Sequence, residues 1–184
     1  MTHIEWIESS KTWICPKSGK YKVICVGGGA SGACEVPGST QQTIASKAGG
    51  TTSFGSYLSA NGGAAAELVE NVYYASGFPG FTGFNYGGAP SIAIKEASAS
   101  RIATMVLNEG GIPGKTTAPG YGAGGGAIGD AVGAGNAGRI KVTIVDLEVG
   151  QNVACTIGTG GSSNSAEYIA AGADGVIVVQ YLGA

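Results

Sequence analysis

The uneven placement of glycine is the strongest constraint on what this chain can fold into. Glycine supplies 35 of the 184 residues and crowds the middle of the chain, whereas stretches near both ends have the composition of β-strands. An ordered glycine loses much backbone entropy and buries no side chain. A chain carries this many glycines where backbones must approach closely or where long loops are displayed. Both uses favour a structural role or a displayed surface over an active site.

The composition also excludes several classes of function. Charged residues make up 12% of the chain and the formal net charge is −2, so no basic surface for nucleic acid is predicted. The sequence contains no run of about 20 apolar residues, so no membrane insertion is expected. Acidic residues in the stretch Met1–Glu8 stand where a signal peptide needs an apolar core, so export by that route is not expected.

The reactive side chains do not form a recognisable catalytic or metal site. His3 is the single histidine, so a histidine-dependent triad is not expected, and no pair of cysteines has the spacing of metal ligands. Cys25 and Cys155 lie on the apolar faces of alternating segments and are predicted to be buried free thiols, although an even count also permits two disulfides. We therefore predict no enzyme activity, no metal and no cofactor. The four cysteines are Cys15, Cys25, Cys34 and Cys155.

Strand-like segments frame the glycine-rich region on its N-terminal side. Residues 12–16 are aromatic and β-prone, and residues 21–26 form a β-branched run bounded by glycines. Weaker strand candidates lie inside the glycine-rich region at residues 51–58, 66–74 and 90–108. The last of these also contains a stretch that could form a helical turn.

Strand patterns return toward the C-terminus. Ile140, Val142 and Ile144 alternate with other residues and share one face of a predicted strand. Residues 152–157 alternate again after a short turn, which predicts a hairpin with one solvated face. The nearly all-apolar residues 175–182 predict a central strand that is buried on both faces.

These patterns predict an all-β fold in a single domain, residues 1–184. Turn signals at short intervals indicate a β-sandwich or a jelly-roll-like domain. The strand framework is predicted from residues 1–30 and 139–184. Residues 31–138 are predicted to form a glycine-rich loop insertion whose loops are partly polyglycine-like or polyproline II-like.

Two glycine motifs resemble nucleotide-binding loops but lack the required context. Gly27, Gly29 and Gly32 follow a strand in the G-x-G-x-x-G pattern, which holds a pyrophosphate only when a helix comes next. Here Pro37 soon ends any such helix. The second match, at Gly120–Gly129, follows no apolar strand and lacks the Lys-Ser/Thr ending of a phosphate loop. Both are interpreted as packed glycine segments.

A third glycine motif has a repeat of three residues. In Gly77–Gly87 each of three glycines is followed by a phenylalanine, namely Phe78, Phe81 and Phe84. Three residues per turn is the period of the polyproline II conformation, which would place these aromatic rings along one edge. The rings either cap the core or lie exposed, where they could stack on sugar or insert into a partner surface.

The framed strands and glycine blocks resemble the glycine-rich domain of bacteriophage tail fibre and tail-tip proteins. The resemblance covers nearly the whole chain. Two departures are that residues 71–109 contain less glycine than the middle of that domain and that the strand–turn–strand block comes late. The matching blocks are Thr12–Pro16, Tyr21–Gly29, Ala48–Gly55, Ala60–Gly63, Val142–Gly161 and Gly175–Tyr181.

The resemblance implies a non-enzymatic virion protein of the tail fibre or tail tip that attaches to a bacterial surface receptor. The receptor would be a glycan or an outer-membrane protein, and other virion proteins would be further partners. The resemblance also implies a homotrimer that assembles in the host cytoplasm. The alternative is a purely structural virion protein, such as a head decoration, collar or tail subunit. The candidate receptor-binding residues are Phe78, Phe81, Phe84, Asn85, Tyr86 and Tyr121.

Overall fold

The computed structural model describes residues 3–36, 42–66, 120–127 and 132–184. These residues contain no helix, and their regular structure consists of antiparallel strands, which confirms the predicted all-β class. The narrower β-sandwich or jelly-roll assignment stays a prediction. The strands are β1 (Ile4–Ile7), β2 (Lys11–Ile14), β3 (Gly19–Val26), β4 (Ala33–Glu35), β5 (Thr43–Ile44), β6 (Thr52–Phe54), β7 (Leu58–Ala60), β8 (Val132–Gly133), β9 (Ile140–Leu147), β10 (Asn152–Thr156) and β11 (Val176–Gly183).

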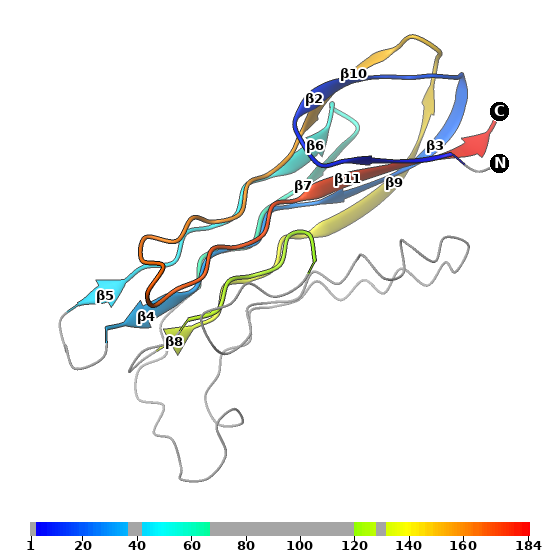
Figure 1. Ribbon diagram of the computed structural model, residues 1–184. Helices are drawn as coiled ribbons and strands as arrows, with labels where there is room; N and C mark the ends of the chain where they lie inside the picture. Colours follow the sequence, from blue (N-terminus) through cyan, green and yellow to red (C-terminus); the bar gives the residue numbers. More distant parts are fainter. Residues whose placement is uncertain (1–2, 37–41, 67–119, 128–131) are drawn as a thin grey trace.

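Two four-stranded sheets lie at the end of the molecule that carries both chain termini (Figure 1). The first sheet has the strand order β1-β11-β3-β9, and the second has the order β2-β10-β6-β7. A three-stranded sheet of order β5-β4-β8 lies at the opposite end. Strand β11 is central, as predicted, and its residues Val176–Val179 are buried. We call the two ends the sheet end and the apex.

The predicted hairpin of residues 139–157 is wrong in its pairing. Strand β9 pairs with β3 in the first sheet, whereas β10 pairs with β2 and β6 in the second. The intervening turn is present, because the N–H of Gln151 donates to the carbonyl of Glu148 at 3.0 Å. Gly150 in this turn has a φ of 80°, which favours glycine. The turn therefore carries the chain from one sheet to the other.

Strand β9 carries apolar side chains on both faces, so the alternation alone does not show which face meets the core between the sheets. Leu147 is buried in the core between the sheets, and Val145 packs against that core. On the opposite face Ile140 is buried, but Val142 and Ile144 are 40% and 59% exposed. The face predicted from Ile140, Val142 and Ile144 therefore exists but is turned away from the second sheet.

One hydrophobic core lies between the facing sides of the two sheets. The ring of Trp13 lies 5.6 Å from the ring of Tyr21 in an edge-on arrangement and 5.6 Å from the ring of Phe54. Phe54 and Ala60 belong to β6 and β7, inside the range that the sequence assigned to a loop insertion. The sheet framework therefore includes residues 52–60. The buried members are Ile7, Trp13, Cys15, Tyr21, Val23, Cys25, Phe54, Ala60, Leu147, Val153, Cys155, Ile177 and Val179.

All four cysteines are buried free thiols, which confirms the prediction made for Cys25 and Cys155. Burial raises the pKa of Cys25 to about 12 and that of Cys155 to about 11. A thiol with so high a pKa is almost entirely protonated at neutral pH and is a poor nucleophile. These cysteines therefore act as small core residues.

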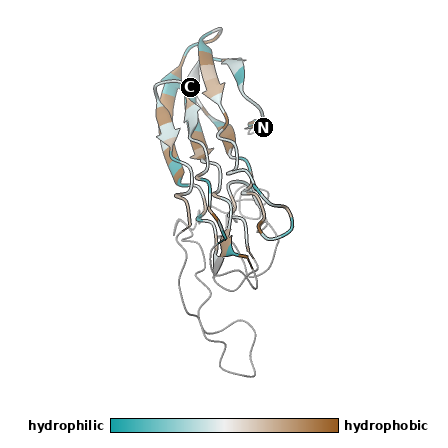
Figure 2. Ribbon diagram, turned by 90° about the vertical axis from the view of Figure 1, so that its left-hand side faces the viewer, coloured by the Kyte–Doolittle hydropathy of each residue, from teal (hydrophilic) through white to brown (hydrophobic). Residues whose placement is uncertain are grey.

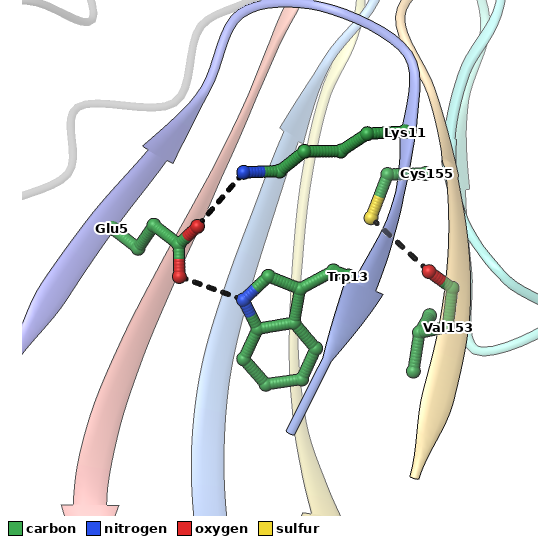
Figure 3. A network of polar contacts seen from close by, with 5 residues as sticks. All are labelled: Glu5, Lys11, Trp13, Val153 and Cys155. Carbon is green, nitrogen blue, oxygen red and sulfur yellow. Dashed lines mark hydrogen bonds and ion pairs between the residues drawn. The ribbon is translucent and has the colours of Figure 1, made fainter. Parts of the chain in front are cut away.

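A polar cluster joins the two sheets at one edge (Figure 3). The carboxylate of Glu5 on β1 accepts hydrogen bonds from the Trp13 indole N–H at 2.7 Å and from the Lys11 ammonium at 2.9 Å, both on β2. Burial alone would raise the pKa of Glu5. The two hydrogen bonds and the positive charge of Lys11 outweigh it and hold this pKa below its ordinary value of 4.5.

The Glu5 cluster gives a pH-dependent contribution to stability. A carboxyl group whose pKa is lowered by folding stabilises the protein above its unfolded-state pKa, and this contribution is lost as pH falls through the folded-state value. Because Glu5 is partly exposed, we expect less than about 1 kcal/mol. Urea unfolding should show wild type more stable than Glu5→Gln at pH 7, with a smaller difference at about pH 3. An equal difference at both pH values would contradict the assignment.

Between the sheet end and the apex, residues 27–32 run through the centre of a bundle of glycine-rich segments. The partner of each successive backbone N–H changes, and the same partner segment returns every third residue, which is the period of polyproline II. These hydrogen bonds measure 2.9–3.1 Å. They run from Gly27 and Ala30 to residues 136–139, from Gly28 and Ser31 to residues 47–50, and from Gly29 and Gly32 to residues 170–173.

Three more segments donate hydrogen bonds to the same central backbone. The N–H groups of Gly63, Gly161 and Gly125 reach the carbonyls of Gly28, Gly29 and Ala30, respectively, at 2.7–2.8 Å. Six segments thus surround the central one, and the long segments run side by side toward the apex (Figure 1). Figure 2 shows them mostly in pale colours, in contrast to the strongly coloured strands. We call this unit the glycine bundle: residues 27–32, 47–50, 61–66, 122–127, 135–139, 158–161 and 170–175.

Glycine is required in the bundle because neighbouring backbones touch. A Cβ atom at Gly29 would lie 1.9 Å from the carbonyl oxygen of Ala123, and one at Gly28 would lie 2.2 Å from that of Thr159. Real Cβ atoms do not come this close to backbone oxygen. The abundance of glycine therefore reflects close backbone approach, one of the two uses that the sequence suggested.

Candidate functional site

Most of the predicted receptor-binding residues lie outside the described part of the chain. Phe78, Phe81, Phe84, Asn85 and Tyr86 fall within residues 67–119, which the structure does not describe. The hypothesis that these aromatic residues contact a receptor therefore stays a prediction.

Tyr121 is described, and it lies at the sheet end of the bundle. Its ring stacks on Trp6 of β1 with the ring centroids 6.1 Å apart. Its hydroxyl donates a hydrogen bond to the carboxylate of Glu8, and this hydrogen bond together with burial raises the pKa of Tyr121 to about 12. Both ends of this side chain are therefore occupied within the molecule. The structure does not bring Tyr121 to the apex.

The two G-x-G-x-x-G matches are parts of the glycine bundle. The N–H groups of Gly27, Gly29 and Gly32 donate to backbone carbonyls, so they are not available to cradle a phosphate. The residues that follow form strand β4, where a nucleotide-binding fold would need a helix. Gly122 and Gly125 of the second match also donate to carbonyls within the bundle. Both motifs therefore serve packing, as the sequence interpretation held.

The apex presents a loop, residues 162–169, beside the three-stranded sheet. Ile169 is 1% exposed and packs with Cys34 and Ala127, so it anchors the loop on the bundle. The hydroxyl of Ser163 donates to the carbonyl of Ile169 at 2.9 Å. The N–H of Ile169 donates to the carbonyl of Ser165 at 3.0 Å. The loop is thus a closed turn held by its own hydrogen bonds, and we call it the apex loop.

Polar and aromatic side chains gather on the apex loop. Asn164 and Glu167 are exposed, while Tyr168 is half-buried and packs against the cluster around Cys34. The neighbouring carboxylate of Glu167 raises the pKa of Tyr168. An amide, a carboxylate and an aromatic ring on a fixed loop are groups that can hydrogen-bond and stack on a sugar or a peptide.

The sequence analysis missed the apex loop. The segment begins as a run of glycine and serine, a composition that is typical of a connecting loop. Asn164, Glu167 and Tyr168 interrupt the small residues between Gly161 and Gly172, and this break in composition was the available signal. These three residues lie at the apex because the glycine bundle places them there, and the composition does not predict the bundle.

The described ranges contain neither a candidate metal site nor a candidate membrane-spanning helix. No group of three or more His, Cys, Asp or Glu residues in these ranges is placed to hold a metal ion. Nor does any helix in them have the length and apolar character needed to cross a bilayer. Comparisons with known protein families, curated proteins and solved structures found no match to this chain.

Proposed function

We propose that this chain is a bacteriophage virion component of the tail fibre or tail tip that attaches the particle to a bacterial surface receptor. The observation that carries the proposal is the bundle, which holds a polar and aromatic loop at the end farthest from both termini. The termini would connect to other virion proteins, and the apex would meet a glycan or an outer-membrane protein. The homotrimer and the assembly in host cytoplasm remain expectations from the sequence resemblance. No catalytic step is part of the proposal.

The glycine bundle supports this proposal through its rigidity. Each turn of the central segment bonds to neighbours in several directions, which leaves little freedom to the loops at its end. A loop that is already ordered loses less entropy when it binds a partner. The apex loop adds its own hydrogen bonds to this constraint. A displayed and preorganised surface is the property that an attachment protein needs.

A second candidate function is a purely structural virion protein that binds only other subunits. The observation that favours it is a group of exposed apolar residues at the sheet end: Ile14 is 61% exposed, Tyr57 41% and Val149 65%. The segments that carry them are joined, because the Gly150 N–H donates to the Cys15 carbonyl at 2.8 Å and the Gln151 side-chain amide donates to the Tyr57 hydroxyl at 2.5 Å. Exposed apolar residues that lie together mark protein contacts more often than sugar contacts.

Binding of labelled protein to a panel of bacterial strains distinguishes these functions. Attachment predicts saturable binding to some strains and a loss of at least about tenfold in affinity for the double variant Glu167→Ala, Tyr168→Ala, a difference of about 1.4 kcal/mol. Replacement of Phe78–Tyr86 by glycine and serine tests the sequence hypothesis in the same assay. Val149→Ser, at the opposite end, is the matched control and should bind like wild type.

The outcomes separate the apex loop from the function itself. If binding survives in the apex variant but is lost in the Phe78–Tyr86 variant, the attachment function stands, and its site lies in residues 78–86 and not in the apex loop. If no strain binds while the protein co-purifies with other virion subunits, the structural function replaces attachment. Circular dichroism and urea unfolding of each variant ensure that a loss of binding is not a loss of folding.

A further inference from the structure

We infer that strand β9 is a self-association surface, on which a second copy of this chain pairs its own β9 in antiparallel orientation about a two-fold axis at Thr143. The inference concerns the sheet end and does not depend on the proposed function. It rests on three features of β9: an edge with which no described strand pairs, two exposed apolar residues, and the pairing that the spacing of these residues allows.

The first feature is the edge. Strand β9 is eight residues long and stands at the end of the first sheet, with β3 on one side. Among the described residues, no backbone pairing reaches β9 from its other side. A long edge strand presents a row of N–H and C=O groups that can pair with another strand. Natural proteins usually shorten, bend or cover such an edge.

The second feature is the apolar surface beside that edge. Val142 and Ile144 lie on the outer face of β9 and are 40% and 59% exposed. Val142 pairs with Ile24 of β3, which is buried in a hydrophobic cluster, so the two exposed side chains lie at the border of that cluster. An edge strand with outward apolar side chains gains from covering both its backbone groups and these side chains in one contact.

The third feature is the fit between two copies of the strand. In a continuous sheet, opposite residues point to the same face, so the two-fold axis must pass through a residue position. An axis at Thr143 pairs seven residues, 140–146, and sets Val142 opposite Ile144 of the second copy, twice. No residue then faces a like charge: Lys141 meets Val145, and Asp146 meets Ile140.

Other registers of β9 are less favourable. An axis at Ile144 also pairs seven residues, 141–147, but it matches Ile144 with itself and sets Val142 opposite Asp146, so one pair of exposed apolar residues forms in place of two. An axis at Val142 pairs five residues, 140–144, in place of seven. A shift by one residue would send Ile144 to the face that carries the polar Lys141 and Thr143. The Thr143 register is therefore the one that best matches apolar side chains and uses most of the edge.

This pairing defines an assembly that differs from the expected homotrimer. A two-fold contact uses the same surface on both copies and closes on itself, and such dimers are the commonest soluble oligomers. One strand pair makes a small interface, so we expect a weak dimer that forms in the micromolar range. The two glycine bundles would point in opposite directions.

Sedimentation velocity on the full chain tests the pairing. We expect a concentration-dependent monomer–dimer equilibrium up to about 100 µM protein and a dissociation constant at least about tenfold higher for Ile144→Lys. Leu182→Lys is the matched control, because this exposed apolar residue lies on β11, which β3 separates from β9, and the change should leave association unchanged. A monomer at all concentrations, or equal effects of the two variants, overturns the inference.

Cysteine cross-linking tests the register. In Thr143→Cys the two introduced thiols face each other across the axis, so oxidised glutathione should convert them into one intermolecular disulfide while it is reduced to two molecules of glutathione. Lys141→Cys, on the same face of the strand, lies opposite Val145 and should give little covalent dimer. The native cysteines are buried and serve as the background. Equal cross-linking of both variants overturns the Thr143 register.

Discussion

Gly29→Ala is expected to lower the free energy of unfolding by about 3 kcal/mol or more. This is the larger of the two effects that we predict for adding a methyl group to a glycine. The added Cβ would lie 1.9 Å from the carbonyl oxygen of Ala123 and 2.4 Å from its carbonyl carbon. Both are backbone atoms, so no side chain can turn away to make room. Relief of the clash would separate two segments and strain the bond from the Gly29 N–H to Ala173. Urea unfolding followed by tryptophan fluorescence measures the loss.

Gly150→Ala is the matched control for this prediction. Gly150 has a φ of 80°, and a Cβ there would meet no atom within 4 Å. The change therefore costs backbone strain alone, about 1–2 kcal/mol for a residue with a left-handed conformation. If Gly29→Ala were no more destabilising than Gly150→Ala, the close packing around residues 27–32 would be refuted.

The sequence predicts which segments are strands better than it predicts how they pair. The period of two and the β-branched composition identify β3, β9, β10 and β11. These patterns say which residues share a face, but a strand with apolar residues on both faces gives no choice between them. In β9, Leu147 is buried in the core and Val145 packs against it, whereas the alternation pointed to the other face. The short turn after β9 is typical of a hairpin, but the two strands that it connects belong to different sheets. Pairing depends on contacts between distant residues, which local patterns do not encode.

The glycine bundle illustrates the same limit in a different conformation. The number of glycines indicates close approach of backbones, and the structure bears this out at Gly28 and Gly29. The sequence does not predict which segments approach one another. The N–H groups of the central segment bond to residues 47–50, 136–139 and 170–173, which are far apart in the sequence. Hydrogen bonds between backbones carry no side-chain signal. For the same reason the position of the apex loop, and of Tyr121 away from it, follows from the structure alone.

Phe54→Ala is the second large effect, and it tests where the folded framework ends. Phe54 is completely buried and packs with Trp13 at a ring distance of 5.6 Å. Removal of a buried aromatic ring deletes its contacts and leaves a cavity, which costs about 3–5 kcal/mol. The sequence assigned residues 31–138 to a glycine-rich loop insertion, with residues 51–58 as a weaker strand candidate inside it; a residue of a loop outside the core would lose little on this change. The free energy of unfolding in urea, measured at neutral pH, distinguishes the two views.

Tyr57→Ala provides the comparison that makes this test specific to burial. Tyr57 lies three residues farther along the same chain segment, and its ring contacts that of Phe54 at 6.2 Å, yet the side chain is exposed. Its removal uncovers little and should cost less than about 1 kcal/mol. A similar small loss for Phe54→Ala would mean that β6 and β7 are not needed by the core. A large loss for Phe54→Ala alone would show that the middle of the chain contributes a strand pair that the sheet end needs in order to fold.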